Sequence, residues 1–173
     1  MEIITAAESQ FADVRRFYHS LIDDMREAHM NITWIKDVYP SPDFLRESIR
    51  RREVYIGCQS GDIAAAMVLN HQYNEGYRAF PWRTEAKDAE IMVIHALGVH
   101  PRYSGKGCGR EMVAKAISTA KGAGMKAIRL DVLSGNLPAK RLYTGCGFQY
   151  MQTVQMFYEN TGTADFELYE YVL

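Results

Sequence analysis

Three glycines alternate with other residues in the segment Ser104-Gly105-Lys106-Gly107-Cys108-Gly109, where an apolar run ends and a helical pattern begins. Glycine has no Cβ, so its main chain can take positive φ angles and approach a ligand closely. The unpaired N–H groups and the dipole of a helix start favour a phosphate group. Arg102, Lys106 and Arg110 add cationic side chains. The spacing therefore predicts a local phosphate-binding turn.

Two other glycine patterns fit this segment poorly. A Walker loop needs Ser or Thr after Gly-Lys to hold magnesium, but Gly105-Lys106 is followed by Gly107. A dinucleotide fingerprint that starts at Gly105 has Arg110 where its third glycine is required. A glycine-rich turn with a purely structural role stays open on these residues alone.

A single histidine stands in the apolar run from Ile91 to Val99, at His95. A lone histidine in such a strand is usually a packed core residue, and a catalytic role is the alternative. The three cysteines, Cys58, Cys108 and Cys146, are odd in number and far apart. We interpret them as reduced, packed thiols, because this spacing suits neither a disulfide framework nor a metal knuckle. No metal site is predicted.

Residues 90–148 resemble the GNAT superfamily of acetyl-CoA-dependent N-acetyltransferases. The family signature, (Gln/Arg)xxGx(Gly/Ala), falls on residues 104–109, preceded by Val99 and Pro101, and Ser104 departs from it. The resemblance implies that main-chain amides of this turn hold the pyrophosphate of acetyl-CoA. The set of cofactor-binding residues that it implies is Leu97, Gly98, Val99, Ser104, Gly105, Lys106, Gly107, Cys108, Gly109, Arg110, Asn136 and Tyr143.

A second block, residues 136–148, resembles the family's Asn-x-x-Ala…Tyr…GlyPhe segment. Asn136 and Tyr143 lie two helical turns apart, about 10 Å along one face, so both could line the pantetheine arm. The alternative makes Asn136 an N-cap and Tyr143 a packed aromatic. By resemblance, Tyr143 is the general acid or stabiliser of the leaving thiolate. A hydrogen bond from the neutral phenol suffices, because full proton transfer is uphill by about 2 kcal/mol.

The segment around His95 resembles that of the arylalkylamine N-acetyltransferases, which carries a catalytic histidine. Val93 stands where many family members have a glutamate, so His95 is the leading base candidate and Glu90 the second. An imidazole with a pKa near 6.5 is a weak base for an alkylammonium near 10.4, so we expect the proton to leave through water. Gly98 suits the strand bulge of the family, with the Leu97 N–H on the thioester carbonyl. Close helix packing is the alternative role of Gly98.

Hydrophobic periodicity and turn residues divide the chain into elements. The expected strands are 3–5, 54–58, 63–69, 90–99, 127–133, 150–158 and 166–173, and the expected helices are 7–26, a helix begun by Ser41 and Pro42, 107–121 and 136–144. Residues 71–88 read as a long loop. The strands at 90–99 and 127–133 are expected to be parallel, and the last two strands to form an antiparallel hairpin at the sheet edge. We predict one α/β (or α+β) domain over residues 1–173, a mixed sheet of six to seven strands splayed near the acetyl-CoA site with helices on both faces.

Composition excludes several classes of protein. The 173 residues carry 20 Lys and Arg against 21 Asp and Glu, a net charge of −1, so no global positive field attracts nucleic acid or an anionic membrane. The longest apolar run, Ile63 to Leu69, is far shorter than the roughly 20 residues of a membrane span. The first residues lack the pattern of a secretion signal, and we expect a cytoplasmic protein.

These patterns together predict an N-acetyltransferase that moves the acetyl group of acetyl-CoA to a primary amine by direct attack in a ternary complex. A small-molecule amine is the favoured acceptor. The alternatives are a protein or peptide amine and a non-catalytic acyl-CoA-binding module, and the chain is expected to be a monomer or homodimer. A cation-friendly acceptor pocket, or else ordinary surface charge and core aromatics, explains Asp23, Asp24, Glu27, Trp34, Tyr39, Tyr77 and Trp82.

Overall fold

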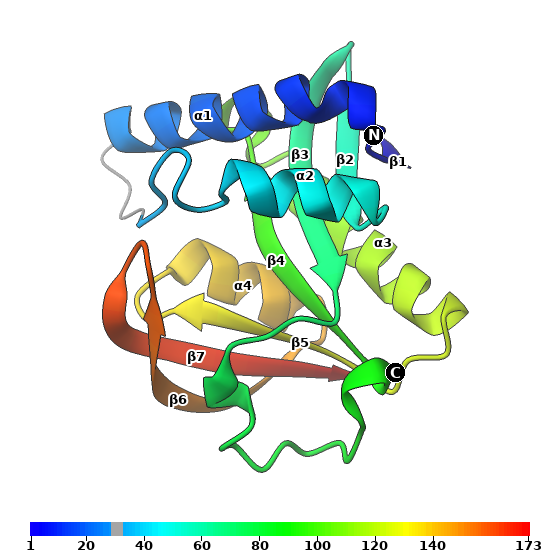
Figure 1. Cartoon of the computed structure of the whole chain (residues 1–173), viewed down its shortest axis with the longest axis vertical. Coiled ribbons are helices and arrows are strands. Elements are labelled where there is room, and N and C mark those ends of the chain that lie inside the picture. Colours follow the sequence, from blue (N-terminus) through cyan, green and yellow to red (C-terminus); the bar gives the residue numbers. More distant parts are fainter. Residues whose placement is uncertain (29–32) are drawn as a thin grey trace. The chain divides into compact units, whose positions relative to one another are not determined.

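The computed structural model describes residues 1–28 and 33–173. Within these ranges, seven strands form one mixed sheet in the order β1-β2-β3-β4-β5-β7-β6, together with four α-helices (Figure 1). The predicted α/β class and strand number are therefore confirmed. The elements are β1 Glu2–Thr5, α1 Phe11–Glu27, α2 Pro42–Arg50, β2 Val54–Gln59, β3 Asp62–Asn70, β4 Ile91–Val99, α3 Cys108–Gly122, β5 Ala127–Leu133, α4 Leu137–Gly145, β6 Gln149–Tyr158 and β7 Gly162–Val172. No helix in the described ranges is long and apolar enough to cross a membrane.

The described chain divides into two compact units. The first unit contains residues 1–69 and 95–112, and the second contains residues 70–94 and 113–173. Strand β4 and helix α3 each contribute residues to both units. That residues 1–173 form one domain remains a prediction.

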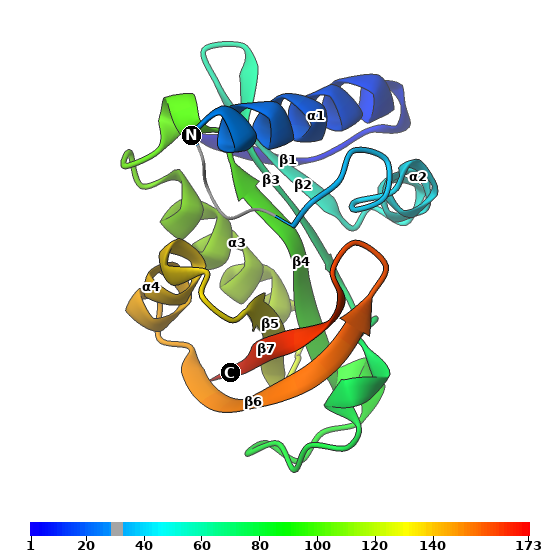
Figure 2. The ribbon, with the colours of Figure 1, turned by 90° about the vertical axis from the view of Figure 1, so that its left-hand side faces the viewer.

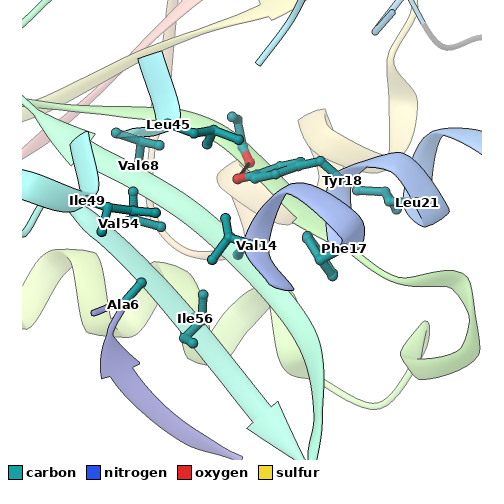
Figure 3. Close-up of a cluster of buried hydrophobic side chains, with 12 residues drawn as sticks. Ala6, Val14, Phe17, Tyr18, Leu21, Leu45, Ile49, Val54, Ile56 and Val68 are labelled. Atoms are coloured by element: carbon teal, nitrogen blue, oxygen red, sulfur yellow. Dashed lines mark hydrogen bonds between the residues drawn. The ribbon is translucent and has the colours of Figure 1, made fainter. Parts of the chain in front are cut away.

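The core of the first unit lies between helices α1 and α2 and the strands β1 to β3 (Figure 3). The apolar positions of α1 recur every three or four residues and therefore share one face of the helix. This face packs on side chains of β2 and β3, and the buried residues are Ala6, Val14, Phe17, Tyr18, Leu21, Leu45, Ile49, Val54, Ile56, Ala66, Val68 and Ala96. The predicted helix 7–26 is confirmed, with a short 3₁₀ turn, Glu8–Gln10, before α1.

Two local signals in the first unit act as the sequence predicts. The Ser41 hydroxyl accepts a hydrogen bond from the Phe44 N–H at 3.2 Å, and Pro42 occupies the first turn of α2. Strands β2 and β3 pair antiparallel through a two-residue turn in which Ser60 and Gly61 both have positive φ angles. The hairpin is therefore confirmed.

In the second unit, β4 and β5 are parallel, as predicted, over the three pairs from Ile91 with Ala127 to Val93 with Arg129. Strands β6 and β7 form the predicted antiparallel hairpin. Strand β7 also pairs with β5, so β7 lies between β5 and the outer strand β6 (Figure 2). Strand β7 begins at Gly162, four residues before the predicted start, because the tight hairpin pairs Gly162 with Tyr158.

The predicted loop at 71–88 is ordered around aromatic rings of the second unit. It contains a 3₁₀ turn, Glu75–Tyr77, and the Trp82 ring N–H donates to the Tyr77 carbonyl at 2.8 Å. Arg129 of β5 donates to the Thr84 carbonyl at 2.7 Å and lies 4.3 Å from the Trp82 ring centroid. The buried Arg129 is paired with Glu170 of β7 at 3.0 Å. These contacts hold the segment against β5 and β7.

Gly98 of β4 is required by close packing in the first unit, because a Cβ at this position would lie 2.4 Å from Leu21 Cδ2 and 3.5 Å from the Trp34 ring. We predict that Gly98→Ala lowers the free energy of unfolding by about 1–3 kcal/mol, the usual cost of overpacking a core. The matched control is Gly122→Ala at the end of α3, where no described atom lies within 4 Å of the added methyl group. Urea unfolding measures both variants, and equal stabilities would contradict this role.

Candidate active site

Within strand β4, Ala96 has a left-handed φ of 48°. The carbonyl of Ala96 accepts a hydrogen bond of 2.9 Å from the hydroxyl of Tyr18 on α1, drawn as the dashed line in Figure 3. Burial raises the pKa of Tyr18 well above its usual value, so the phenol stays protonated and donates. A conformation that is unfavourable for alanine is thus stabilised by a buried hydrogen bond.

The hydrogen bond from Tyr18 to the Ala96 carbonyl fixes the direction of the next N–H group. A trans peptide directs its C=O and N–H groups in opposite directions. Because the Ala96 carbonyl is directed at Tyr18, the Leu97 N–H is directed away from that hydroxyl. Gly98 has no positive φ, and a Cβ there would lie 2.4 Å from Leu21 Cδ2, which fits its alternative role in helix packing. The strand bulge with the Leu97 N–H as donor stays a prediction.

His95 directly precedes Ala96 and is partly buried. Its ring meets the ring of Phe44 from α2 edge to face, with centroids 6.2 Å apart. Val93, two residues earlier, is completely buried. Within β4, His95 is therefore the titratable side chain next to the kinked peptide.

The glycine turn follows β4 through a short 3₁₀ turn, Pro101–Tyr103. Gly105 and Gly107 have φ angles of 74° and 84°, and no described atom lies within 4 Å of where their Cβ atoms would be. Both are exposed, and α3 begins at Cys108. The Ser104 N–H donates to the Pro101 carbonyl at 3.0 Å, so this amide is used by the turn itself. The predicted positive φ angles are confirmed at two of the three glycines.

The side chains of the turn divide into exposed cations and a buried thiol. Lys106 is exposed, with its Nζ 5.4 Å from the Tyr103 ring centroid, and Arg110 is also exposed. Arg102 makes only a long ion pair of 3.9 Å with Asp62. Cys108 is buried, with its Sγ 3.9 Å from Gln59 Oε1. The thiol is therefore a packing group, as the sequence predicts, and the charged ends of Lys106 and Arg110 belong to exposed residues.

A cavity of about 400 Å³ in the first unit lies beside the 3₁₀ turn that precedes the glycines. It contains no side chain predicted to be catalytic. Its lining residues are Gln10, Asp13, Arg16, Phe17, Ser20, Cys58, Gly61, Asp62, Ile63, His100, Arg102 and Tyr103. Of the cationic side chains that the sequence places at the glycine turn, Arg102 lines this cavity.

In the second unit, Asn136 and Tyr143 belong to α4. The Asn136 side-chain oxygen accepts from the Ala139 N–H at 3.2 Å, so it is an N-cap, which was one of its two predicted roles. Tyr143 is buried, with its ring centroid 5.5 Å from that of Phe148. The structure therefore shows a local structural role for both side chains.

Glu90, the second base candidate, is held by its neighbours. Its carboxylate accepts from the Lys87 N–H at 2.8 Å and pairs with Lys126 at 3.0 Å. These two partners, the Lys87 hydrogen bond first, lower the pKa of Glu90 below its ordinary value. A carboxylate stabilised in its charged form is a weaker proton acceptor.

The predicted site residues fall into two groups. His95, residues 97–99 and the glycine turn belong to the first unit, whereas Glu90, Asn136 and Tyr143 belong to the second. Among residues 1–28 and 33–173, no three His, Cys, Asp or Glu side chains gather as a metal ion would require.

Sequence reasoning missed Asp131, on β5. Its Oδ2 accepts hydrogen bonds from the hydroxyls of Tyr77 and Tyr158, at 2.7 and 2.8 Å. Burial raises the pKa of Asp131, and this outweighs the two hydrogen bonds, which lower it. The signal was present in the sequence: Asp131 is an acid flanked by apolar residues in a strand, just as His95 is a titratable group in an apolar strand.

A raised pKa in the folded state means that ionised Asp131 destabilises the protein. We predict that Asp131→Asn is more stable than the natural protein at pH 7. The difference shrinks as the pH falls through the raised folded-state pKa towards about 4, the ordinary pKa, below which Asp131 is protonated in both states. Thermal unfolding between pH 4 and 8 measures this, with Glu159→Gln in the exposed β6–β7 turn as the control. A less stable Asp131→Asn protein at pH 7 would contradict the assignment.

Comparison with known proteins places the fold and the sequence pattern in a family. The profile described as "Acetyltransferase (GNAT) family" matches residues 15–148. The N-alpha-acetyltransferase RimI of Mycobacterium tuberculosis is 28% identical over 126 residues, covering 73% of this chain and 71% of that protein. The mycothiol acetyltransferase of Actinosynnema mirum is 33% identical over 69 residues, covering 40% of this chain and 23% of that protein.

A solved structure supports the same fold. A protein of Salmonella typhimurium, determined with its cofactor acetyl-CoA, superposes with a TM-score of 0.72 at 18% identity. The match covers 99% of this chain and 93% of that one. At this identity the likeness extends to the fold.

Proposed function

Because the chain belongs to the GNAT family of acetyltransferases, we propose that it moves the acetyl group of acetyl-CoA to a primary amine, with a small-molecule amine as the favoured acceptor. The dependence on acetyl-CoA and the acyltransferase activity belong to the family. The observation that carries the proposal is the pair of left-handed glycines, Gly105 and Gly107, at the start of α3.

The glycine turn suits the pyrophosphate of acetyl-CoA. The space where Cβ atoms of Gly105 and Gly107 would lie is open, so an anion can approach the main chain closely. The first N–H groups of α3 have no partners inside the helix and carry its positive dipole end. Lys106 and Arg110 add exposed positive charge. Bound acetyl-CoA supplies the activated acetyl thioester, and this turn supplies its anchor.

The kinked peptide of β4 is the proposed activator of the acetyl carbonyl. The Leu97 N–H, directed away from Tyr18, donates to the carbonyl oxygen as negative charge develops there. The buried Tyr18–Ala96 hydrogen bond keeps this peptide in place before substrates arrive. The donor therefore needs no reorganisation during the reaction.

His95 and Tyr143 are the proposed proton carriers. His95 accepts the proton of the amine through water, and it is preferred to Glu90 because the Glu90 carboxylate is held by Lys87 and Lys126. The amine nitrogen forms its bond to the acetyl carbon as the carbon–sulfur bond breaks. The Tyr143 hydroxyl donates to the departing sulfur. Direct attack agrees with the burial of Cys108, which keeps that thiol from acting as a nucleophile.

The names of the two relatives indicate two kinds of acceptor for those proteins. One is an N-alpha-acetyltransferase, and the other is a mycothiol acetyltransferase. The match to the first relative covers 126 residues and the match to the second covers 69 residues. For this chain, the choice of a small amine rests on its own residues.

The experiment that tests the proposal follows release of the coenzyme A thiol with acetyl-CoA and a panel of primary amines. We expect thiol release that depends on an amine and rises from pH 6 to 9 as free amine accumulates. Tyr143→Phe should lower kcat by tenfold or more while leaving the Kd of acetyl-CoA within about threefold, because the phenol acts on the leaving group.

The control for this variant is Tyr150→Phe, which removes the hydroxyl of a half-exposed tyrosine in β6. Absence of amine-dependent thiol release from the natural protein would refute the function. An unchanged kcat for Tyr143→Phe at saturating substrates would remove Tyr143 from the mechanism and leave the function standing.

A further inference from the structure

His100 is a buried polar residue between β4 and the glycine turn, and its main chain and its ring both have partners in the first unit. Its N–H donates to the Ala64 carbonyl of β3 at 2.9 Å, and its carbonyl accepts from the Tyr103 N–H at 2.8 Å. Its two ring nitrogens have partners on α1 and in the 3₁₀ turn Pro101–Tyr103. His100 therefore connects three elements just before the chain enters the glycine turn.

The hydrogen bonds of the imidazole determine which nitrogen carries its proton. Nδ1 accepts from the Arg102 N–H at 3.4 Å, so Nδ1 has no proton of its own. The proton is therefore on Nε2, which lies 3.1 Å from Ser20 Oγ and 3.3 Å from Asp24 Oδ2, both on α1. The ring accepts from the 3₁₀ turn and donates to α1, so it forms a bridge between them.

Aromatic packing holds this bridge in one orientation. The His100 ring lies between Phe17 of α1, with centroids 6.5 Å apart, and Tyr103 of the 3₁₀ turn, with centroids 6.4 Å apart. A buried polar side chain whose hydrogen bonds are all made specifies one arrangement of its partners. An apolar side chain in the same place would pack without fixing the direction of the Arg102 N–H.

The glycine turn itself has few contacts that could hold it in place. Residues 104–107 are exposed, and no described atom lies within 4 Å of where the Cβ atoms of its two left-handed glycines would be. The turn is therefore positioned at its two ends. At one end Cys108 is buried at the start of α3, and at the other end lies the 3₁₀ turn that His100 caps.

We propose that His100 is a positioning residue for acetyl-CoA. Its imidazole bridges α1 and the 3₁₀ turn, and so holds the N–H groups of the glycine turn in the arrangement that binds the pyrophosphate. This inference rests on the proposed function, in which the glycine turn anchors acetyl-CoA. His100 acts through the turn, so its effect is confined to the part of acetyl-CoA that carries the pyrophosphate. A preorganised turn loses less freedom when the cofactor binds.

The first test is calorimetric titration of coenzyme A into the natural protein, His100→Ala and His100→Asn, at a temperature where circular dichroism shows each to be folded. We expect His100→Ala to weaken binding by about tenfold, equivalent to about 1.4 kcal/mol. Asparagine also caps turns and can accept from the Arg102 N–H, but it is too short to replace the contact with Ser20. His100→Asn should therefore bind with an intermediate affinity.

The two extremes for His100→Asn would each overturn the bridge. Affinity equal to that of the natural protein would mean that the contact with α1 has no role. Affinity equal to that of His100→Ala would mean that the cap on Arg102 has no role. The matched control is His19→Ala, also on α1, whose Nε2 lies 2.9 Å from Asp37 Oδ1. We expect this variant to bind coenzyme A like the natural protein.

A second test distinguishes positioning from a general loss of structure. S-acetylpantetheine has the same thioester as acetyl-CoA but no pyrophosphate, so the two donors are compared with the amine that gives the fastest thiol release. His100→Ala should lower kcat/KM for acetyl-CoA by about tenfold and leave kcat/KM for S-acetylpantetheine within about threefold. Equal losses with both donors would overturn the proposal, because a merely structural role affects both alike.

These outcomes separate this inference from the proposed function. If the natural protein binds no coenzyme A and releases no thiol with any amine, the proposed function fails. If the natural protein binds coenzyme A and His100→Ala binds it equally well, only the role of His100 fails.

Discussion

The path of the main chain from Ala96 to Cys108 is the constraint on which the candidate site depends. Three residues on this path have left-handed φ angles: Ala96, Gly105 and Gly107. At Ala96 the strain, of the order of 1–3 kcal/mol, is offset by the Tyr18 hydrogen bond and by packing in the core of the first unit. At the two glycines the surroundings are open. The absence of a side chain permits the positive φ angle and lets a ligand approach the main chain. The same stretch thus combines a rigid interior peptide with an accessible turn.

Positive charge at the candidate site is local, because the chain as a whole has no net positive charge. The chain has a net charge of −1, yet exposed Lys106 and Arg110 stand at the turn proposed to hold a pyrophosphate. In the second unit Arg129 pairs with Glu170 and Lys140 with Glu167, whereas Asp131 accepts hydrogen bonds from the phenols of Tyr77 and Tyr158. Burial raises the pKa of Asp131, because the hydrogen bonds from the two phenols do not offset the loss of solvation.

Elements with local signals could be predicted from the sequence. Ser41 and Pro42 mark the start of α2, and the Ser60-Gly61 turn connects β2 and β3, because caps and tight turns depend on neighbouring residues. The glycine turn was found for the same reason: positive φ angles and glycine go together. The pattern also predicted the parallel pair of β4 and β5, which follows from a strand-helix-strand order.

The features that could not be predicted depend on partners far away in the chain. The kink at Ala96 is stabilised by Tyr18, 78 residues earlier, and alanine itself gives no sign of a left-handed angle. In the sequence, the glycine at position 98 favours a strand bulge. In the structure, Leu21 occupies the space that a side chain at this position would need. Asp131 became a candidate only through hydroxyls that lie 54 and 27 residues away in sequence. Such contacts are set by tertiary packing, which residue spacing does not contain.

The most direct measurement is calorimetric titration of coenzyme A into the natural protein, Gly107→Ala and Gly61→Ala. Both glycines have positive φ angles and open surroundings, so the two variants carry similar backbone strain, but only Gly107 lies in the turn. The account predicts that Gly107→Ala weakens binding by tenfold or more and that Gly61→Ala binds like the natural protein. No binding to the natural protein, or equal affinities in all three, would contradict a main-chain site for the pyrophosphate.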